Sequence, residues 1–353
     1  MPRAWTVINF KGWPLADTVK LVYTVLLLQV LMASSLSQPD CTSLYEYADA
    51  GPPVVEETLL AEDEQLVEYR LVIHSVNDEL VPALLSVPKK GGGPFPVIIL
   101  LHGYGGDKDD LIEAAEPLAQ RGYAAAAIDA QYHGERKEEG RNMYSADTEV
   151  TIEAFAQTVM DVRRLIDHLE TREDVDATRI GLVGASMGAL LGTIASGVEP
   201  RIDVPVLIVG GGNMTLLIGE SQLSRVVEIR AELDEAGRSI QEEAEALLCI
   251  DPLTFVGMIS PRPLLMINGR NDEIVPVSTN EALYSAARDP KKIIWFDTGH
   301  DVPTEKSAMR AFFWFEKHLK RRFYLQNWFY LLVILIVMVP AVIILRGIVA
   351  GKP

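Results

Sequence analysis

The stretch Gly184-Ala185-Ser186-Met187-Gly188 places a single hydroxyl between two glycines, after an apolar run and before an apolar helical pattern. A sharp strand-to-helix turn forces its central residue into strained backbone angles, and flanking glycines let neighbouring backbone pass close by. The Oγ of Ser186 can then project into a cleft as a nucleophile. Because an ordinary glycine-rich connection has the same pattern, this interpretation depends on partners elsewhere in the chain.

Two such partners follow later apolar runs. A serine hydroxyl is a poor nucleophile until a base takes its proton, and that base needs a carboxylate to hold its tautomer. Asp272 lies in the segment LLMINGRNDEIVP, and His300 lies in IIWFDTGHDVP. We therefore predict a catalytic triad of Ser186 as nucleophile, His300 as base and Asp272 as acid. Asp251 and Asp297 are weaker candidates for the acid.

The segment LLHGYGGDKDD supplies a candidate oxyanion hole. A carbonyl under attack develops negative charge on its oxygen, which backbone N–H groups stabilise. The turn after His102 can aim the N–H of Tyr104 at that oxygen, and the N–H of Met187, at a helix N-terminus, supplies a second donor. The side chain of Tyr104 is then free to line the substrate pocket, for which Tyr132 and His133 are further candidates. For His102 itself we expect a structural hydrogen-bonding role.

The elements that must position these residues alternate between short apolar runs and amphipathic helices. The strand candidates are a hairpin around residues 76–78 and the runs 97–101, 124–128, 180–183, 204–209, 264–267 and 293–296. This alternation predicts an α/β fold with a mostly parallel, eight-stranded sheet and helices on both faces. In such a sheet ligands bind beyond the carboxyl ends of the strands, where all the candidate residues lie.

The domain organisation follows from these elements. Residues 65–320 are expected to form the catalytic domain, preceded by a Pro-rich, acidic linker over 38–64. Between the sixth and seventh strands lies a charged helical insert, 213–249, interrupted by Gly237. Its pattern is that of an ordinary surface helix, but its position near the cleft equally suggests a small lid.

The order of these motifs resembles that of the α/β-hydrolase superfamily. The loop DAQYHGER, after the fourth strand, resembles the dienelactone-hydrolase-like and acetyl-esterase-like members. Dienelactone hydrolases have a cysteine nucleophile, whereas this chain has Ser186, so an ordinary ester is the more plausible substrate. The resemblance implies a carboxylesterase-like serine hydrolase that forms an acyl-enzyme, with no metal and no organic cofactor.

Three functions therefore stay open. The leading hypothesis is a membrane-anchored serine hydrolase that cleaves small-molecule or lipid-like carboxylic esters. A serine peptidase of the prolyl-oligopeptidase-like type shares the fold and the triad order, although this chain has no propeller domain. A non-catalytic hydrolase-fold binding protein is the third, although such proteins have usually lost a triad member.

The two ends of the chain indicate a membrane protein. Basic residues, the apolar run 21–33 and a small, polar stretch follow one another as in a secretory signal, so residues 1–37 are a cleaved signal peptide or an N-terminal anchor. Residues 323–345 contain no charge, and at about 1.5 Å per residue they can cross a hydrocarbon core of about 30 Å. We predict a transmembrane helix there, followed by a short tail, 346–353.

The orientation is predicted from two conflicting signals. The basic residues in 317–322 favour a cytoplasmic domain by the positive-inside rule, whereas the N-terminal signal favours export. Because the first hydrophobic segment usually dominates, we expect the catalytic domain to be extracytoplasmic. In an exported domain Cys41 and Cys249 could pair, although their wide separation favours free thiols. The net charge of −17 argues against a nucleic-acid partner.

Overall fold

The computed structural model describes residues 40–48 and 51–320, which include every candidate site residue. The predicted signal or anchor (1–37), the predicted transmembrane span (323–345) and the tail (346–353) lie outside these ranges. Within the described part of the chain, no helix has both the length and the apolar composition needed to cross a bilayer.

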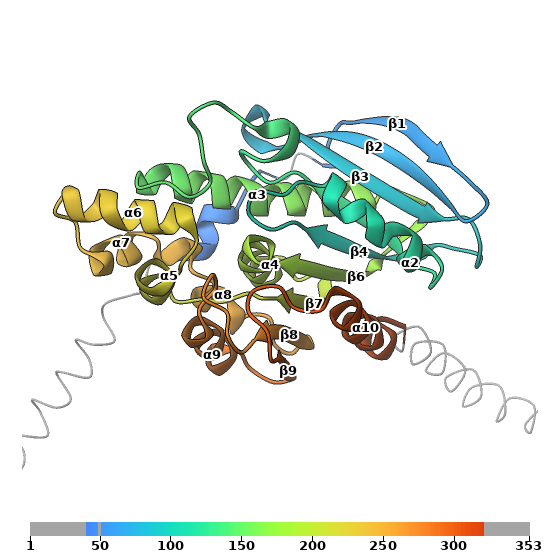
Figure 1. Cartoon of the computed structure of the whole chain (residues 1–353). Helices are drawn as coiled ribbons and strands as arrows, with labels where there is room; N and C mark the ends of the chain where they lie inside the picture. The colour runs from blue at the N-terminus through green and yellow to red at the C-terminus, as the bar shows by residue number, and fades with distance from the viewer. Residues whose placement is uncertain (1–39, 49–50, 321–353) are drawn as a thin grey trace, which may run out of the picture. The chain divides into compact units, whose positions relative to one another are not determined.

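A nine-stranded sheet forms the centre of the described structure, in the order β1-β2-β3-β5-β4-β6-β7-β8-β9 (Figure 1). The strands are β1 (Val55–Glu62), β2 (Leu66–His74), β3 (Leu80–Pro88), β4 (Phe95–Leu101), β5 (Ala124–Ile128), β6 (Val175–Ala185), β7 (Ile202–Ile208), β8 (Leu264–Gly269) and β9 (Lys291–Phe296). Pairing is antiparallel from β1 to β5 and parallel from β5 to β9. The predicted α/β class with a mostly parallel sheet is thus confirmed.

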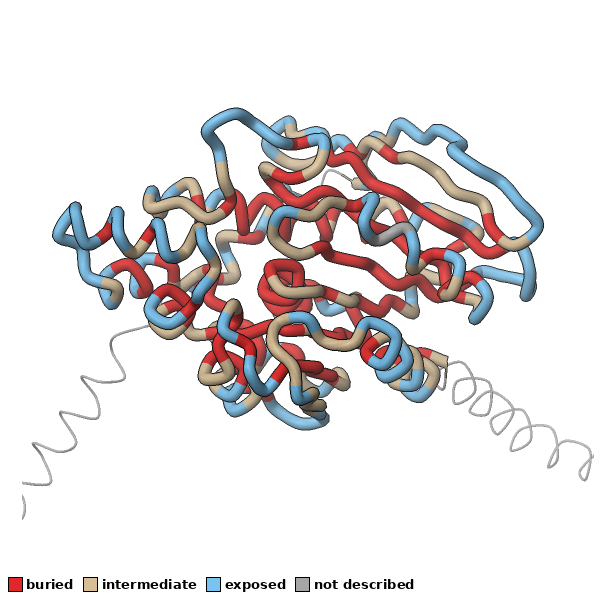
Figure 2. Tube along the Cα trace, viewed as in Figure 1, coloured by how far each residue is buried: buried red, intermediate tan, exposed pale blue. Residues whose placement is uncertain are grey.

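The expected number of eight strands is wrong, because β1 adds a ninth at the edge. β1 pairs antiparallel with β2, and all its residues except the first are exposed (Figure 2). A strand with both faces in water has no need for alternating apolar residues, so its sequence carries no period. This part of the expected linker, 38–64, therefore belongs to the sheet. Nearer its start, Cys41–Tyr45 forms a short 3₁₀ helix, η1.

The sheet has a packed core on each face. Along β4, Val97, Ile99 and Leu101 pack into one core, whereas Ile98 and Leu100 pack into the other, as the alternation of side chains along a strand requires. The first core contains residues of α3 (Thr148–Leu169) and α4 (Met187–Val198). The second contains residues of α2 (Ala115–Ala119) and α10 (Thr304–Phe315). Both faces are therefore covered, and the strand ends are held rigidly.

The insert between β7 and β8 forms several short helices. They are α5 (Met214–Glu220), α6 (Ser224–Glu235), α7 (Ile240–Ala246), η5 (Leu248–Ile250) and α8 (Pro252–Val256). Asn213 caps α5 through its side chain, and Ser239 forms a capping box with Glu242 at the start of α7. The remaining elements are α9 (Val277–Ala286), the π-helical turn η6 (Glu316–Lys320), and the 3₁₀ turns η2 (Val76–Asp78), η3 (Asp109–Ala114) and η4 (Gly134–Arg136).

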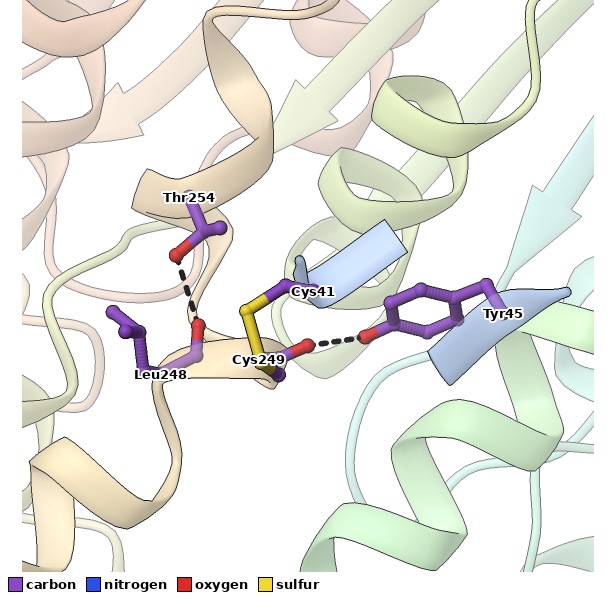
Figure 3. The surroundings of a disulfide bond; sticks show 5 residues. All are labelled: Cys41, Tyr45, Leu248, Cys249 and Thr254. Carbon is purple, nitrogen blue, oxygen red and sulfur yellow. Dashed lines mark hydrogen bonds between the residues drawn. A yellow bond between two sulfur atoms is a disulfide. The ribbon is translucent and has the colours of Figure 1, made fainter. Parts of the chain in front are cut away.

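A disulfide between Cys41 and Cys249 ties η1 to the end of the insert (Figure 3). The Tyr45 hydroxyl donates a hydrogen bond of 2.6 Å to the carbonyl of Cys249, and the Thr254 hydroxyl donates one of 2.8 Å to the carbonyl of Leu248. Free thiols, which the separation of 208 residues favoured, are therefore not what the structure contains. Separation along the chain is a poor guide here, because the fold brings both segments together.

Candidate active site

Ser186 lies at a sharp turn between β6 and α4. Its backbone has φ +52° and ψ −116°, a strained conformation for a residue with a side chain. The two glycines around it are required by close packing. A Cβ at Gly184 would lie 2.1 Å from the carbonyl oxygen of Gly188, and a Cβ at Gly188 would lie 2.2 Å from that of Leu101. The sequence therefore forms a turn that presents the Ser186 side chain at the N-terminus of α4.

The structure brings Ser186, His300 and Asp272 together. The Nε2 of His300 lies 3.0 Å from the Oγ of Ser186, and its Nδ1 lies 2.8 Å from the Oδ2 of Asp272. An ionised carboxylate only accepts hydrogen bonds, so Nδ1 carries the proton and Nε2 is free to accept from the serine hydroxyl. The other carboxylate oxygen of Asp272 accepts from the amides of Ile274 and Val275, each at 2.9 Å.

The burial of Asp272 and of His300 differs in the way that an orienting carboxylate and a base require. The Asp272 side chain is fully buried, whereas 23% of the His300 side chain is exposed. Asp272 follows β8 and His300 follows β9, and these two parallel strands are neighbours in the sheet. The carboxylate is thus fixed by backbone donors in a dry site, and the imidazole faces the solvent side, where a substrate can reach it.

The two other candidate acids lie elsewhere. Asp251 caps α8, and its carboxylate accepts from the amides of Asn213, Met214 and Leu253 at 2.8–2.9 Å. The side chain of Asp297 is 90% exposed and lies 3.3 Å from Arg270. Asp251 therefore holds the entry of the insert, and Asp297 is a surface residue.

The two residues expected to supply the oxyanion-hole amides, Tyr104 and Met187, line the same cavity as Ser186. The turn that carries Tyr104 packs on the serine, since a Cβ at Gly103 would lie 3.6 Å from the Cβ of Ser186. Met187 is the first residue of α4, where helix amides have no partner within the helix. Neither the Tyr104 nor the Met187 amide takes part in the backbone hydrogen bonds of the described turns, loops and caps. Both are thus available to a ligand atom.

His102 holds two loops together. It is 3% exposed, and its Nε2 accepts a hydrogen bond of 3.1 Å from the amide of Ala130. Its Nδ1 therefore carries the proton and donates to the carbonyl of Gly103 at 2.9 Å. Burial lowers the pKa of this imidazole, so the neutral form is favoured. The structure thus places His102 in a hydrogen-bonding role, linking the loop after β4 to the loop after β5.

The DAQYHGER loop is also organised by a buried carboxylate. Asp129 is fully buried and accepts hydrogen bonds from the amides of Lys108 and Glu135, at 2.9 and 3.0 Å. The Lys108 ammonium, itself only 2% exposed, lies 3.1 Å from the same carboxylate. Gly134 has φ +55°, and a Cβ there would lie 2.2 Å from Asp129. The aspartate and the glycine of this loop therefore maintain its shape.

Of the three candidate pocket residues, only Tyr104 lines the cavity at Ser186. Tyr132 and His133 line a separate, more open hollow that shares Tyr104 with that cavity. The His133 ring meets the Tyr104 ring edge-on at 5.7 Å, and its Nδ1 lies 2.9 Å from the carbonyl oxygen of Gln131. Burial lowers the pKa of His133. The structure thus separates these two residues from the cavity that contains the nucleophile.

Much of the cavity wall comes from the insert, whose individual lining residues were not predicted from the sequence. The insert contributes apolar side chains from α5, from α6 and the residue before it, and from the segment that follows α7, namely Met214, Leu217, Ile218, Leu223, Val226, Ile229 and Leu247. The insert is therefore a wall of the cavity rather than an ordinary surface helix.

In 40–48 and 51–320 no three His, Cys, Asp or Glu side chains come together as a metal site.

Comparison with known proteins shows that the chain is similar to hydrolases. The family described as serine aminopeptidase, S33, matches residues 92–216. The putative hydrolase YtaP of Bacillus subtilis (strain 168) is 27% identical over 247 residues, which cover 66% of this chain and 79% of that protein. The putative esterase YitV of the same strain is 25% identical over 240 residues, covering 64% and 89%.

A solved structure shows the same fold. The acetyl xylan esterase from Paenibacillus sp. R4 matches with a TM-score of 0.66 and 23% identity, and the match covers 79% of this chain and 92% of that one. The fold expected from the motif order is therefore confirmed.

Proposed function

We propose that this protein, an α/β-hydrolase of the serine hydrolase class, cleaves carboxylic esters through an acyl-enzyme formed on Ser186. The observation that carries the proposal is the hydrogen-bonded chain from Ser186 through His300 to Asp272, with distances of 3.0 and 2.8 Å. These hydrogen bonds have the order of donors and acceptors that an activated serine needs.

The reaction follows from that order. His300 Nε2 takes the proton of Ser186 as its Oγ attacks the carbonyl carbon, and the resulting imidazolium is stabilised by Asp272. The same Nε2 then gives the proton to the departing alcohol oxygen, which leaves an acyl-serine. Water enters, loses a proton to Nε2 and attacks the acyl carbon, and the proton returns to the serine oxygen as the acid departs.

The charge that develops on the carbonyl oxygen would be held by the amides of Tyr104 and Met187. Both border the cavity beside Ser186, and Met187 adds the positive end of α4. A donor of this kind contributes about 10²–10³ in kcat where it has been removed by mutation.

A peptidase is the second candidate, because the matching family is described as serine aminopeptidase, S33. An aminopeptidase must bind the ammonium group of its substrate near the serine, and an unpaired carboxylate is the natural partner. Among the residues that line the cavity, the carboxylate is Glu243, which already bonds Thr148 at 2.7 Å and pairs with Arg238. The remaining wall is mainly apolar, which favours an ester with an apolar acyl group.

A labelling experiment tests the proposal against both alternatives. Full-length protein is treated with a fluorophosphonate probe and assayed on p-nitrophenyl esters and on aminoacyl p-nitroanilides. We expect the wild type to be labelled and to hydrolyse esters. Ser186→Ala should prevent labelling and lower kcat for the esters by about 10⁴-fold or more. Ser196→Ala is the matched control on α4, because its buried hydroxyl has no hydrogen-bond partner among the described residues. An unlabelled wild type would favour a binding protein, and faster anilide hydrolysis would favour a peptidase.

The membrane attachment and the location are a further part of the proposal. We infer an enzyme anchored by residues 323–345 with its catalytic domain outside the cytoplasm. The uncharged stretch and the N-terminal signal pattern support this, and so does the Cys41–Cys249 disulfide, since disulfides persist mainly in oxidising compartments.

Protease added to intact cells or spheroplasts tests this orientation. We expect it to digest the catalytic domain while a cytoplasmic marker survives, and we expect the two cysteines to resist alkylation until a reductant is added. Protection of the domain, together with free thiols, would show that it faces the cytoplasm.

A further inference from the structure

We propose that the cavity between Ser186 and the insert is the acyl pocket of the enzyme, and that it selects apolar acyl groups of about five to eight carbons. This inference rests on Ser186 being the nucleophile. The cavity volume of about 80 Å³ is about five to eight times the roughly 10–15 Å³ that one water-sized group requires, which leaves room for a short alkyl chain.

The walls of the cavity fit an alkyl chain. Leu217 and Ile218 of α5 and Ile229 of α6 are each at least 91% buried and face the cavity. Phe155 of α3 and Leu190 of α4 also line the cavity, and they belong to the same apolar core. Such a surface gains free energy from burying methylene groups and has no means of orienting a sugar or an amino acid.

Two polar side chains that the insert contributes to the wall, Glu243 and Ser221, are already bonded within the protein. Glu243, 3% exposed, accepts from the hydroxyl of Thr148 and pairs with Arg238. The hydroxyl of Ser221 donates to the carbonyl of Ile274 at 2.6 Å. A polar acyl group would therefore lose its water without gaining these groups as partners, which is unfavourable.

The position of His300 assigns this cavity to the acyl side of the ester rather than to the alcohol. The departing alcohol must receive its proton from His300, so it lies beside that ring. Among the described residues the cavity is lined by Ser186 and Met187 but not by His300 or Asp272. The acyl chain thus extends away from the imidazole into the cavity beside the insert, and the alcohol lies beside the partly exposed ring of His300.

Two neighbouring valines on α6 provide a matched test. Val226 lines the cavity, whereas Val227, the next residue, is 41% exposed and points away from it. Val226→Phe fills part of the pocket, and Val227→Phe adds the same side chain to the surface. Both proteins are compared with wild type on p-nitrophenyl acetate, butanoate, hexanoate and octanoate.

The expected results follow from the burial of methylene groups. In the wild type kcat/KM should rise by about fourfold per methylene, equivalent to about 0.8 kcal/mol, until the pocket is full. Val226→Phe should lower kcat/KM for the hexanoate and octanoate by about tenfold or more, and for the acetate by less than about twofold, as expected from the loss of about two buried methylenes. Val227→Phe should keep the wild-type profile. A wild type that prefers acetate, or equal losses on all four esters in Val226→Phe, would overturn the acyl pocket.

Binding measurements separate this inference from the proposed function. Calorimetry with hexanoate and acetate on Ser186→Ala protein requires no catalysis. We expect hexanoate to bind more tightly than acetate. Introducing Val226→Phe into the Ser186→Ala protein should remove this difference in affinity, whereas introducing Val227→Phe should not. If no ester is hydrolysed but this pattern is found, the proposed reaction fails and the pocket stands. If esters are hydrolysed through Ser186 but hexanoate binds no better than acetate, the pocket fails and the reaction stands.

Discussion

Replacing Asp272 by Asn tests the triad most directly, because the surroundings of this carboxylate determine the outcome. One oxygen accepts from His300, and the other accepts from the amides of Ile274 and Val275. The amide of Asn has only one acceptor oxygen. If that oxygen keeps the two backbone donors, the NH₂ group faces Nδ1 of His300, which must then become an acceptor and move its proton to Nε2.

In that tautomer Nε2 can no longer take the proton of Ser186. The opposite amide orientation would leave two buried backbone donors without an acceptor, at about 1–3 kcal/mol each. We therefore expect the wrong tautomer to dominate and kcat to fall by about 10⁴-fold, or roughly 5.5 kcal/mol in activation free energy. The measurement is the kcat of purified full-length protein on an activated ester, with thermal unfolding to show that the variant is folded.

Asp251→Asn is the matched control. Asp251 is also buried and accepts from three backbone amides, but it lies at the start of α8 rather than beside His300. We expect Asp251→Asn to lower the free energy of unfolding by about 1–2 kcal/mol through the weakened cap, with kcat close to wild type. If Asp272→Asn keeps kcat within tenfold while folded Asp251→Asn is inactive, the acid of the triad has been assigned wrongly.

Two further predictions concern stability. Because burial lowers the pKa of His102 and His133 below the ordinary value of 6.5, protonation favours the unfolded chain. These two histidines should therefore not reduce the free energy of unfolding above pH 6.5. Below pH 6.5 that free energy should fall, by up to about 1.4 kcal/mol per pH unit for each histidine. Urea denaturation at pH 7.5 and 5.5 measures this, and His133→Gln should reduce the difference. Removing the disulfide with the double substitution Cys41→Ser and Cys249→Ser should lower the free energy of unfolding by about 2–5 kcal/mol. The urea midpoint should fall accordingly, and dithiothreitol should no longer change it.

The sequence predicted the parts of the site that depend on local geometry. The glycines around Ser186 could be interpreted because a Cβ at either would collide with backbone, which is a property of the turn itself. Asp272 and His300 could be found because each follows a parallel strand, and the carboxyl ends of such strands meet at one edge of the sheet. Short, apolar strands are the pattern that a sheet covered on both faces produces.

Other features depend on tertiary packing and have no local signal. β1 lies at the exposed edge of the sheet and needs no apolar period, and Cys41 meets Cys249 only after the insert has folded. Tyr132 and His133 were expected in the pocket because their loop follows a strand end. The loop turns at Tyr132, where φ is +61°, so both residues line the neighbouring hollow.

The division between chemistry and selectivity follows from which elements carry each. The three triad residues come from the ends of β6, β8 and β9, which are fixed by the sheet and by cores on both of its faces. Much of the proposed acyl pocket comes instead from short helices of the insert, whose end is held by the disulfide at Cys249. A change in the insert can therefore alter the size of the pocket without moving Ser186 relative to His300. On this argument, substitutions in α5 and α6 should redistribute activity among acyl chains, whereas substitutions at the strand ends should lower activity on all of them alike.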